Sequence, residues 1–303
     1  MKKGFKIALN LAIFFVIIVF FWYMVASVSK DEAQGYGNLG EAAEPFVSPY
    51  SQVASFEVPE EINRFELNDN KLFISAGQTV YIFDTEGRRL GSFPVAADIR
   101  DIAVEGEEIY LLYPTRIAVY SMSGNLSRQW EACSDLSDYC SFTVAGNTVF
   151  VTDVENKNIC KYTTDGDLVK FIKSPRGFII PSYSFDIDSW NDTIYCVNAG
   201  RHLVETYTLN GDFIAAFGGP GTVSGFFAGC CNPAYISFAP DGTLITSEKG
   251  NPRVSCFKRN GTFISAWLNN KMLGGGSKAY EVKAVDDRLL VAGKNKIKTF
   301  KIQ

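Results

Sequence analysis

The chain beyond residue 50 repeats one short pattern of hydrophobic positions six times. In each copy an aliphatic residue is followed, three positions later, by Phe or Tyr. The six pairs are Val80/Phe83, Ile117/Tyr120, Ile159/Tyr162, Val204/Tyr207, Val254/Phe257 and Ile297/Phe300. Successive copies lie 37 to 50 residues apart, a period that matches a four-stranded propeller blade rather than a helical repeat.

A turn signal follows the first five copies. Four residues after the aromatic comes a Gly, which is preceded by Glu, Ser, Asp or Asn. These glycines are Gly87, Gly124, Gly166, Gly211 and Gly261. Such dipeptides tolerate positive φ and connect the two strands of a hairpin. Further alternating apolar segments precede each copy, and no helix-length apolar period of 3.6 residues occurs after residue 30, so the sequence predicts an all-β domain.

The sixth copy is incomplete, because only three residues follow Phe300. A candidate for its missing outer strand lies at the start of the domain, where Val53–Phe56 resembles Leu90–Phe93 of the first complete copy. A propeller avoids open sheet edges by closing its ring. We therefore predict a six-bladed β-propeller over residues 50–303, closed by an N-terminal outer strand, residues 50–58, that pairs with residues 297–302.

An uncharged, mostly apolar run from Ile7 to Val28 precedes the propeller and is long enough to span a membrane as one helix. Three Lys lie before it, and the positive flank of such a helix stays in the cytoplasm, which puts the propeller outside, in the periplasm or the extracellular space. The alternative is a cleaved signal peptide, with small residues at Ser27–Ser29 as the cleavage point. We expect residues 1–28 to form a cytoplasmic basic tip and transmembrane signal-anchor. Residues 29–49, small, acidic and punctuated by Gly and Pro, are expected to form a flexible linker.

Composition excludes several classes of function. Lys and Arg total 29 against 33 Asp and Glu, a net charge of −4, so the chain lacks the dense basic surface of a nucleic-acid binder. His202 is its one histidine, which rules out zinc sites that use two or three histidines of one chain. The seven cysteines form no C-x-x-C pair, so zinc ribbons, thioredoxin-like chemistry and c-type haem attachment have no support.

The fifth copy carries the most distinctive motif. Gly221 and Gly225-Phe226-Phe227 are followed by a strand that begins at Pro233, by Pro240-Asp241-Gly242, and by Arg253-Val254. This run resembles the blade signature of the NHL-repeat family of six-bladed propellers. The third and fourth copies match it in part, and the others keep only the strand pattern. The resemblance implies the propeller fold, but it leaves function open because propellers include both binding modules and enzymes.

Some neighbouring six-bladed families are enzymes with a site at the mouth of the central channel. Those of the lactonase type bind a divalent metal there through Glu, Asn and Asp. In this chain the inner strands are expected to begin near Arg64, Asp101, Ser141, Ser184, Asn232 and Glu281. This set is not a cage for a hard cation, which needs several converging oxygens, so we expect no metal and no cofactor. Three or more oxygens within metal-binding distance at the mouth would instead favour an enzyme.

A candidate binding site is suggested by two unusual loops of the fifth blade and one loop of the fourth. Propeller topology puts all three loops on one face, beside the channel mouth. The candidate residues are Cys230, Cys231, Asn232, Glu248, Lys249, Arg253 and His202. The structural alternative is a vicinal disulfide, or separate bridges, that stiffens the loop while the charges pair with one another.

The remaining cysteines fall into two groups. Cys133 and Cys140 share a long loop and can form a disulfide in an oxidising compartment. Cys160, Cys196 and Cys256 lie within strands and are expected in the core.

Taken together, these patterns favour a membrane-anchored, extracytoplasmic propeller that serves as a binding or scaffold module. Its membrane contact would be residues 7–28, and its partner a protein, a peptide or a glycan on the loop face. The alternative is a lactonase- or lyase-like enzyme that works at the channel mouth.

Overall fold

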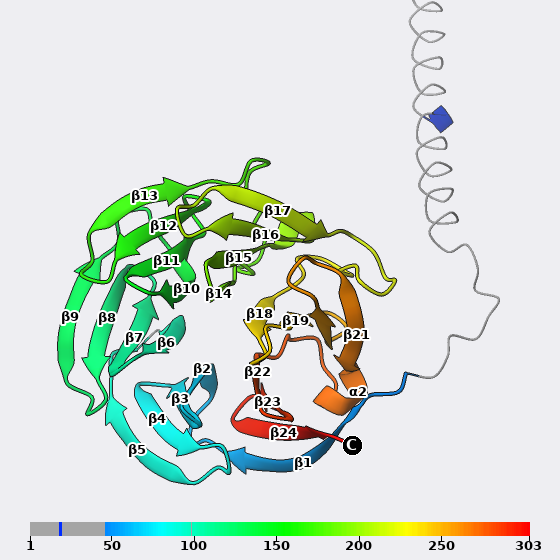
Figure 1. Cartoon of the computed structure of the whole chain (residues 1–303), viewed down its shortest axis with the longest axis horizontal. Helices are drawn as coiled ribbons and strands as arrows, with labels where there is room; N and C mark the ends of the chain where they lie inside the picture. Colours follow the sequence, from blue (N-terminus) through cyan, green and yellow to red (C-terminus); the bar gives the residue numbers. More distant parts are fainter. Residues whose placement is uncertain (1–17, 20–45, 98) are drawn as a thin grey trace, which may run out of the picture. The chain divides into compact units, whose positions relative to one another are not determined.

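The computed structural model describes residues 18–19, 46–97 and 99–303. Residues 48–303 form one unit of six four-stranded antiparallel sheets arranged in a ring (Figure 1). The predicted six-bladed propeller is therefore confirmed. The predicted membrane segment lies outside the described residues except for Ile18 and Val19, as do residues 29–45 of the predicted linker. No helix in the described part of the chain is long and apolar enough to span a membrane.

The first three blades follow one another along the chain, each from its inner to its outer strand. Blade 1 contains β2 (Ile62–Asn68), β3 (Lys71–Ala76), β4 (Thr79–Asp84) and β5 (Arg89–Pro94). Blade 2 contains β6 (Asp101–Glu105), β7 (Glu108–Tyr113), β8 (Arg116–Ser121) and β9 (Leu126–Glu131). Blade 3 contains β10 (Tyr139–Ala145), β11 (Thr148–Asp153), β12 (Asn158–Thr163) and β13 (Leu168–Ile172).

The last three blades include two short helical turns. Blade 4 contains β14 (Ile187–Trp190), β15 (Thr193–Asn198), the 3-10 turn η1 (Ala199–Arg201), β16 (Leu203–Thr208) and β17 (Phe213–Gly218). Blade 5 contains β18 (Tyr235–Phe238), β19 (Leu244–Glu248), β20 (Arg253–Phe257) and β21 (Phe263–Leu268), and α2 (Asn270–Leu273) follows it. Blade 6 contains β22 (Val282–Val285), β23 (Arg288–Ala292), β24 (Lys296–Ile302) and β1 (Tyr50–Glu57).

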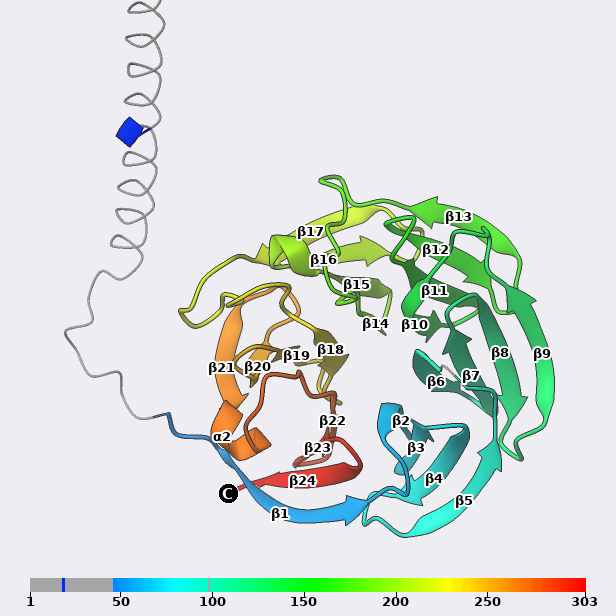
Figure 2. The ribbon, with the colours of Figure 1, turned by 180° about the vertical axis from the view of Figure 1, so that it is seen from behind.

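The ring closes as the sequence predicts. Strand β1 pairs antiparallel with β24, with Tyr50 opposite Ile302 and Phe56 opposite Ile297. The two strands lie side by side at the rim when the molecule is seen from either side (Figures 1 and 2). The first and last strands of the propeller therefore belong to one sheet, and β24 has no open edge.

The repeated hydrophobic positions build the contacts between blades. All six aliphatic residues of the repeat are buried, and so are its aromatics except the partly exposed Tyr120. Val80, for example, packs in one cluster with Ile102 and Ile109 of the next blade. Each pattern position therefore buries apolar area against a neighbouring sheet as well as within its own, which stabilises the ring.

The turn glycines have a packing role as well as a conformational one. Gly124 has φ +82°, and a Cβ placed on it would lie 2.5 Å from Cβ of Phe93 in the preceding blade. At Gly261, with φ +88°, a Cβ would lie 2.2 Å from Cγ of Phe217. These turns need Gly for their left-handed backbone and also because an outer-strand aromatic of the previous blade covers them.

Candidate functional site

The inner strands, or the residue just before them, bring six side chains to the channel as one ring. Its members are Arg64, Asp101, Ser141, Asp186, Tyr235 and Glu281. Blades 4 and 5 thus contribute Asp186 and Tyr235, and the expectation of Ser184 and Asn232 is wrong. The long loops before these two blades bring the chain to the channel two or three residues later than the repeat spacing suggests.

Arg64 occupies the middle of this ring. Its Nε lies 2.9 Å from Oδ1 of Asp101 and 3.5 Å from Oε1 of Glu281, and its Nη2 lies 2.7 Å from Oδ1 of Asp186. The guanidinium also lies over the Tyr235 ring, 4.8 Å from its centroid. Burial by itself would lower the pKa of Arg64, but the three carboxylates outweigh it and hold that pKa well above its ordinary value. The ring is therefore centred on a permanent cation.

The same three carboxylates connect neighbouring blades. The second oxygen of Asp101 accepts the N–H of Phe142 (3.0 Å), and that of Asp186 accepts the N–H of Ile236 (2.8 Å). Glu281 likewise accepts the N–H of Phe65 (3.0 Å). Carboxylates from blades 2, 4 and 6 thus each bond the inner strand of the following blade. The acids are used to join blades and to neutralise Arg64, so this ring is an architectural network.

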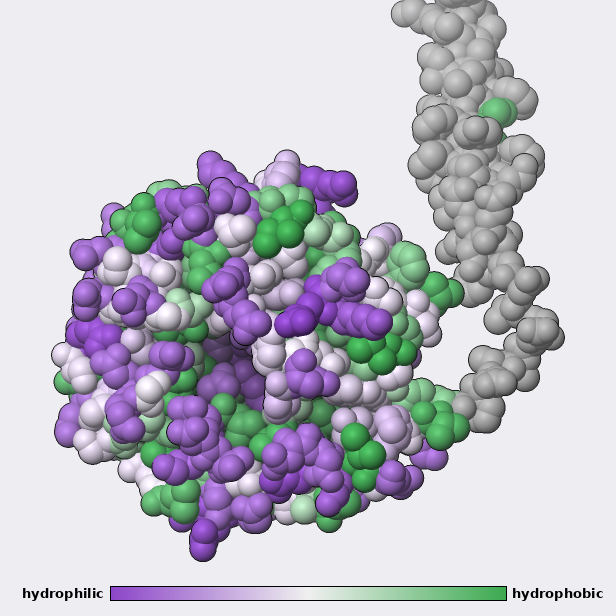
Figure 3. All heavy atoms as spheres, in the orientation of Figure 1, coloured by the Kyte–Doolittle hydropathy of each residue, from purple (hydrophilic) through white to green (hydrophobic). Residues whose placement is uncertain are grey.

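A second charged layer lies two residues further along the inner strands. Lys283 Nζ lies 2.7 Å from Oε2 of Glu66, and Asp188 lines the same narrow space of about 30 Å³ between the layers. Figure 3 shows the hydrophilic hollow at the centre of the ring. The channel thus holds more carboxylates than cations.

This excess of acid raises two pKa values. Burial raises the pKa of Glu281 to about 7, with help from Asp101 and against the opposing effect of Arg64. Burial also raises the pKa of Asp188 to about 7, although Lys283 acts to lower it. By contrast, hydrogen bonds from Arg128 lower the pKa of Glu108 in blade 2.

We expect the propeller to become less stable as the pH rises from about 5 to about 8. Over this window folded Glu281 and Asp188 bind protons that the unfolded chain, with ordinary pKa values near 4, has already released. Their stabilisation is complete below about pH 4 and is lost as the pH passes 7. Groups with lowered pKa values, such as Glu108, titrate below the window.

Urea unfolding at several pH values measures how the free energy of unfolding changes with pH. Glu281→Gln should reduce this change, whereas Glu57→Gln, at an exposed rim pair with Lys296, should leave it as in the wild type. A wild-type stability that is constant or rises between pH 5 and 8 would contradict the expectation.

The structure answers the question of a metal cage at the channel mouth. Three carboxylates do converge there, but they converge on the guanidinium of Arg64. In residues 46–97 and 99–303, the acids of this ring do not form a cluster whose oxygens are close enough to share an ion. The observation that would favour a metal-dependent enzyme is therefore not met at this ring.

Most of the candidate residues of the fifth blade make their contacts within the protein. A disulfide joins Cys230 to Cys231, which is the structural alternative that the sequence left open. Asn232 is buried and holds the turn at Lys249, accepting its N–H (2.8 Å) and donating to its carbonyl (3.0 Å). The buried Glu248 pairs with Arg253 (2.7 Å).

Two further contacts fix the same loop. Glu248 accepts the N–H of Ala228 (3.1 Å), and Arg253 donates to the carbonyl of Phe226 (2.8 Å). The buried pair therefore anchors the loop that leads into β18. Removing Arg253 would leave Glu248 buried without its counter-charge, so the observed role of this pair is a structural one.

Lys249 and His202 point to other neighbours. Lys249 Nζ donates to the hydroxyls of Ser182 and Ser184, and burial lowers its pKa. His202 follows η1 in a left-handed conformation, and its carbonyl accepts the N–H of Gly219. Its buried Nδ1 has no hydrogen-bond partner within the part of the chain that the structure describes.

The structure does not join Cys133 to Cys140. The Cys140 thiol lies 3.1 Å from the carbonyl of Tyr183, whereas Cys133 Sγ lies 3.6 Å from Sγ of Cys160 in β12. All of these thiols are free. Cys160, Cys196 and Cys256 are buried, as their place in strands predicts. The Cys133 side chain thus lies beside β12 and not beside Cys140.

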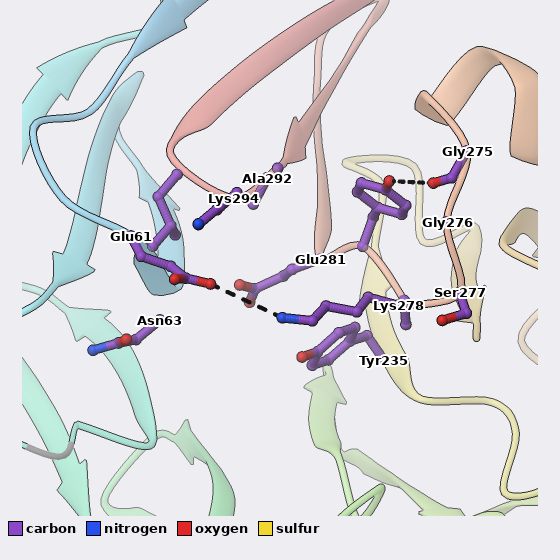
Figure 4. Close-up of a pocket in the computed structure, with 14 residues that line it drawn as sticks. Glu61, Asn63, Tyr235, Gly275, Gly276, Ser277, Lys278, Glu281, Ala292 and Lys294 are labelled. Carbon is purple, nitrogen blue, oxygen red and sulfur yellow. Dashed lines mark hydrogen bonds and ion pairs between the residues drawn. The ribbon is translucent and has the colours of Figure 1, made fainter. Parts of the chain in front are cut away.

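A pocket that the sequence did not reveal lies at the channel mouth between blades 6 and 1. It has a volume of about 530 Å³, and its lining includes Glu61, Lys278 and Lys294 as well as Tyr235 and Glu281 of the ring. Lys278 Nζ lies 4.0 Å from Oε1 of Glu61, and Figure 4 shows these two side chains facing each other across the opening.

A glycine-rich loop forms one wall of this mouth pocket. Gly274, Gly275 and Gly276 all have positive φ, a backbone that L side chains rarely adopt. Tyr280 fastens the loop by donating its hydroxyl to the carbonyl of Gly275 (2.9 Å). The run of three glycines before Ser277 and Lys278 was the available sequence signal.

Comparison with known proteins supports the fold. No protein-family model matches the chain, and no curated protein sequence matches it. Virginiamycin B lyase from Staphylococcus aureus has a similar structure, with a TM-score of 0.62 at 13% identity over 84% of this chain and 100% of that one. The Pan2 WD40 domain from Neurospora crassa has a TM-score of 0.52 at 12% identity over 85% and 97% of the two chains.

The lyase has also been solved as an inactive variant. In that structure, which is similar at a TM-score of 0.61 and 12% identity over 84% of this chain and 100% of that one, a histidine is replaced by alanine and quinupristin is present. At such low identity the likeness shows the propeller fold alone. It does not favour the NHL-repeat family in particular, and that resemblance stays a prediction.

Proposed function

We propose that this chain is a membrane-anchored binding module whose propeller, outside the cytoplasm, holds a partner at the mouth pocket. The observation that carries the proposal is a contrast between two sets of charges. The ring groups in the channel are buried and fully engaged with one another. The charges at the pocket opening are exposed and weakly paired.

The charged side chains at the opening of the mouth pocket can give up their contacts with each other and bind a partner instead. The side chains of Lys278 and Glu61 are 91% and 55% exposed, and their atoms are 4.0 Å apart. Such surface pairs contribute about 0–1 kcal/mol, so a partner that offers its own charges loses little by breaking them. The Tyr235 ring at the pocket floor adds a flat surface for a side chain or a sugar.

A peptide segment of a protein is the partner that this chemistry favours. Acidic and basic groups of both signs, Glu61 with Lys278 and Lys294, line one pocket, and they complement the mixed charges of a polypeptide better than an uncharged glycan. The fold is also shared with a WD40 domain, and propellers commonly present loop faces for recognition.

The membrane part of the proposal rests on the sequence. The apolar run at residues 7–28 and the Lys residues before it support an anchor with a cytoplasmic N-terminus. The enzyme alternative, of lactonase or lyase type, rests on likeness of fold. The chain's single histidine, His202, lies after η1 and outside the six-residue ring.

Cross-linking on intact cells tests this proposal. A membrane-impermeant cross-linker should join the full-length chain to its partner, and the double variant Glu61→Ala with Lys278→Ala should reduce recovery about tenfold, equivalent to roughly 1.4 kcal/mol. The matched control is Asp287→Ala with Lys301→Ala, another exposed pair (3.2 Å), on blade 6.

Three results would contradict the proposal. Equal capture by the wild-type chain and the pocket variant would exclude the pocket. Cross-linking only after the cells are lysed would exclude the outside location. Recovery of glycans without protein would exclude a peptide partner.

A further inference from the structure

Two cysteines and an aspartate from separate parts of blade 3 meet between blades 2 and 3. Cys133 lies in the loop before β10, Asp153 ends β11, and Cys160 lies in β12. One ligand atom from each lies within 4.8 Å of the other two, and in the described part of the chain this is the one such group of His, Cys, Asp or Glu. None of the three takes part in the channel ring or the mouth pocket.

The spacing of the sulfurs matches a shared metal ion. The two Sγ atoms are 3.6 Å apart. Two thiolates bound at about 2.3 Å to a tetrahedral Zn²⁺ stand about 3.8 Å apart, whereas a disulfide requires about 2.05 Å. Metal uptake therefore needs little rearrangement of the sulfurs.

The aspartate is held in place for a similar role. Its Oδ1 accepts the N–H groups of Asn156 (3.1 Å) and Asp138 (3.3 Å), and its Oδ2 accepts the Asn156 amide (2.8 Å). Carboxylates that bind metals are commonly oriented by such outer hydrogen bonds. Asn158 Oδ1, 3.4 Å from Cys160 Sγ, provides a fourth potential ligand atom at the same place.

Charge gives an independent reason to expect a cation. Asp153 is fully buried, and no ion pair with Lys or Arg involves it in residues 46–97 and 99–303. A buried carboxylate without a counter-charge is costly. A divalent cation that also binds the two sulfurs would supply that charge.

We propose that Cys133, Cys160 and Asp153 bind a thiophilic divalent cation of the Zn²⁺ class, with Asn158 Oδ1 or a water as the fourth ligand. Bound metal would fasten the loop that connects blades 2 and 3 to the middle strands of blade 3. Ligand binding to the folded state raises stability by mass action, so the site is expected to be a structural one.

The test uses the reduced full-length chain with Cys230→Ser and Cys231→Ser in mild detergent, because reduction would otherwise free these two thiols to bind the probe. Cd²⁺ and Zn²⁺ alone are the probes. We expect one Cd²⁺ per chain, seen as an ultraviolet thiolate-to-metal band, and a higher melting temperature with Zn²⁺. Cys133→Ser and Cys160→Ser should each abolish both effects.

X-ray absorption of the Zn²⁺-bound chain with Cys230→Ser and Cys231→Ser keeps the test independent of how the Cys133 and Cys160 variants fold. Two sulfur and two lighter ligands are expected. Absence of the band, a band that survives Cys133→Ser, or isolation of the native chain with Cys133 and Cys160 joined in a disulfide would overturn the proposal.

Discussion

Replacing Arg64 with methionine is expected to lower the free energy of unfolding by about 3–5 kcal/mol at pH 7. The substitution leaves Asp101, Asp186 and Glu281 buried around an apolar side chain with no positive charge among them. Because these carboxylates also bond the backbone of the following blades, their repulsion acts on three blade junctions together. Urea unfolding of the variant and the wild type measures the difference.

A matched arginine separates this effect from loss of cation–π contact. Arg89 lies over the Tyr81 ring (4.9 Å) but is exposed on an outer strand, so Arg89→Met should change stability by about 0.5 kcal/mol or less. The loss of stability in Arg64→Met should be smaller at pH 5, because burial raises the pKa of Glu281 to about 7 and this acid is then protonated. An Arg64→Met variant as stable as the wild type would show that the carboxylates do not depend on the guanidinium.

Removing the closing strand is expected to have an effect of similar or greater size. A chain that begins at Glu60 lacks β1, so β24 keeps its pairing with β23 but its outer edge is left open along its length. It also loses the buried Tyr50, worth roughly 1.5–3 kcal/mol, and the Phe56 side chain that packs on Gly87 of blade 1. We expect a much lower melting temperature and association through the exposed edge.

Thermal unfolding with light scattering measures both consequences. A chain that begins at Ser48 retains β1 and is the control, which should melt as the propeller of the full-length chain does. If the chain that begins at Glu60 stayed monomeric and melted at the same temperature, closure by β1 would not stabilise the ring.

The fold was predictable because its signal is local and repeated. The aliphatic position of the repeat is buried in all six blades and the aromatic position in five, so the copies reinforce one interpretation. The closing strand was predictable because β1 carries the outer-strand pattern that the sixth copy lacks. Neither inference required knowing how distant side chains meet.

The site was less predictable because it depends on loop length and on distant pairs. Spacing suggested Ser184 and Asn232 for the ring, but long loops before blades 4 and 5 replace them with Asp186 and Tyr235. Nearness in sequence suggested a bond between Cys133 and Cys140, whereas the fold places Cys133 beside Cys160. The charge of Glu248 was visible in the sequence, but its burial against Arg253 was not.

Pairing of β1 with β24 also fixes the order of events when the protein is made. Strand β1 is the first strand of the propeller to be made, and its partner β24 is the last. It therefore stays unpaired until nearly all the other residues of the propeller have been made. Ordering so long an intervening segment is slow, and until then the half-made ring has two open edges. Maturation of this protein is therefore expected to end in a single late step, and its newly made form should depend on chaperones up to that moment.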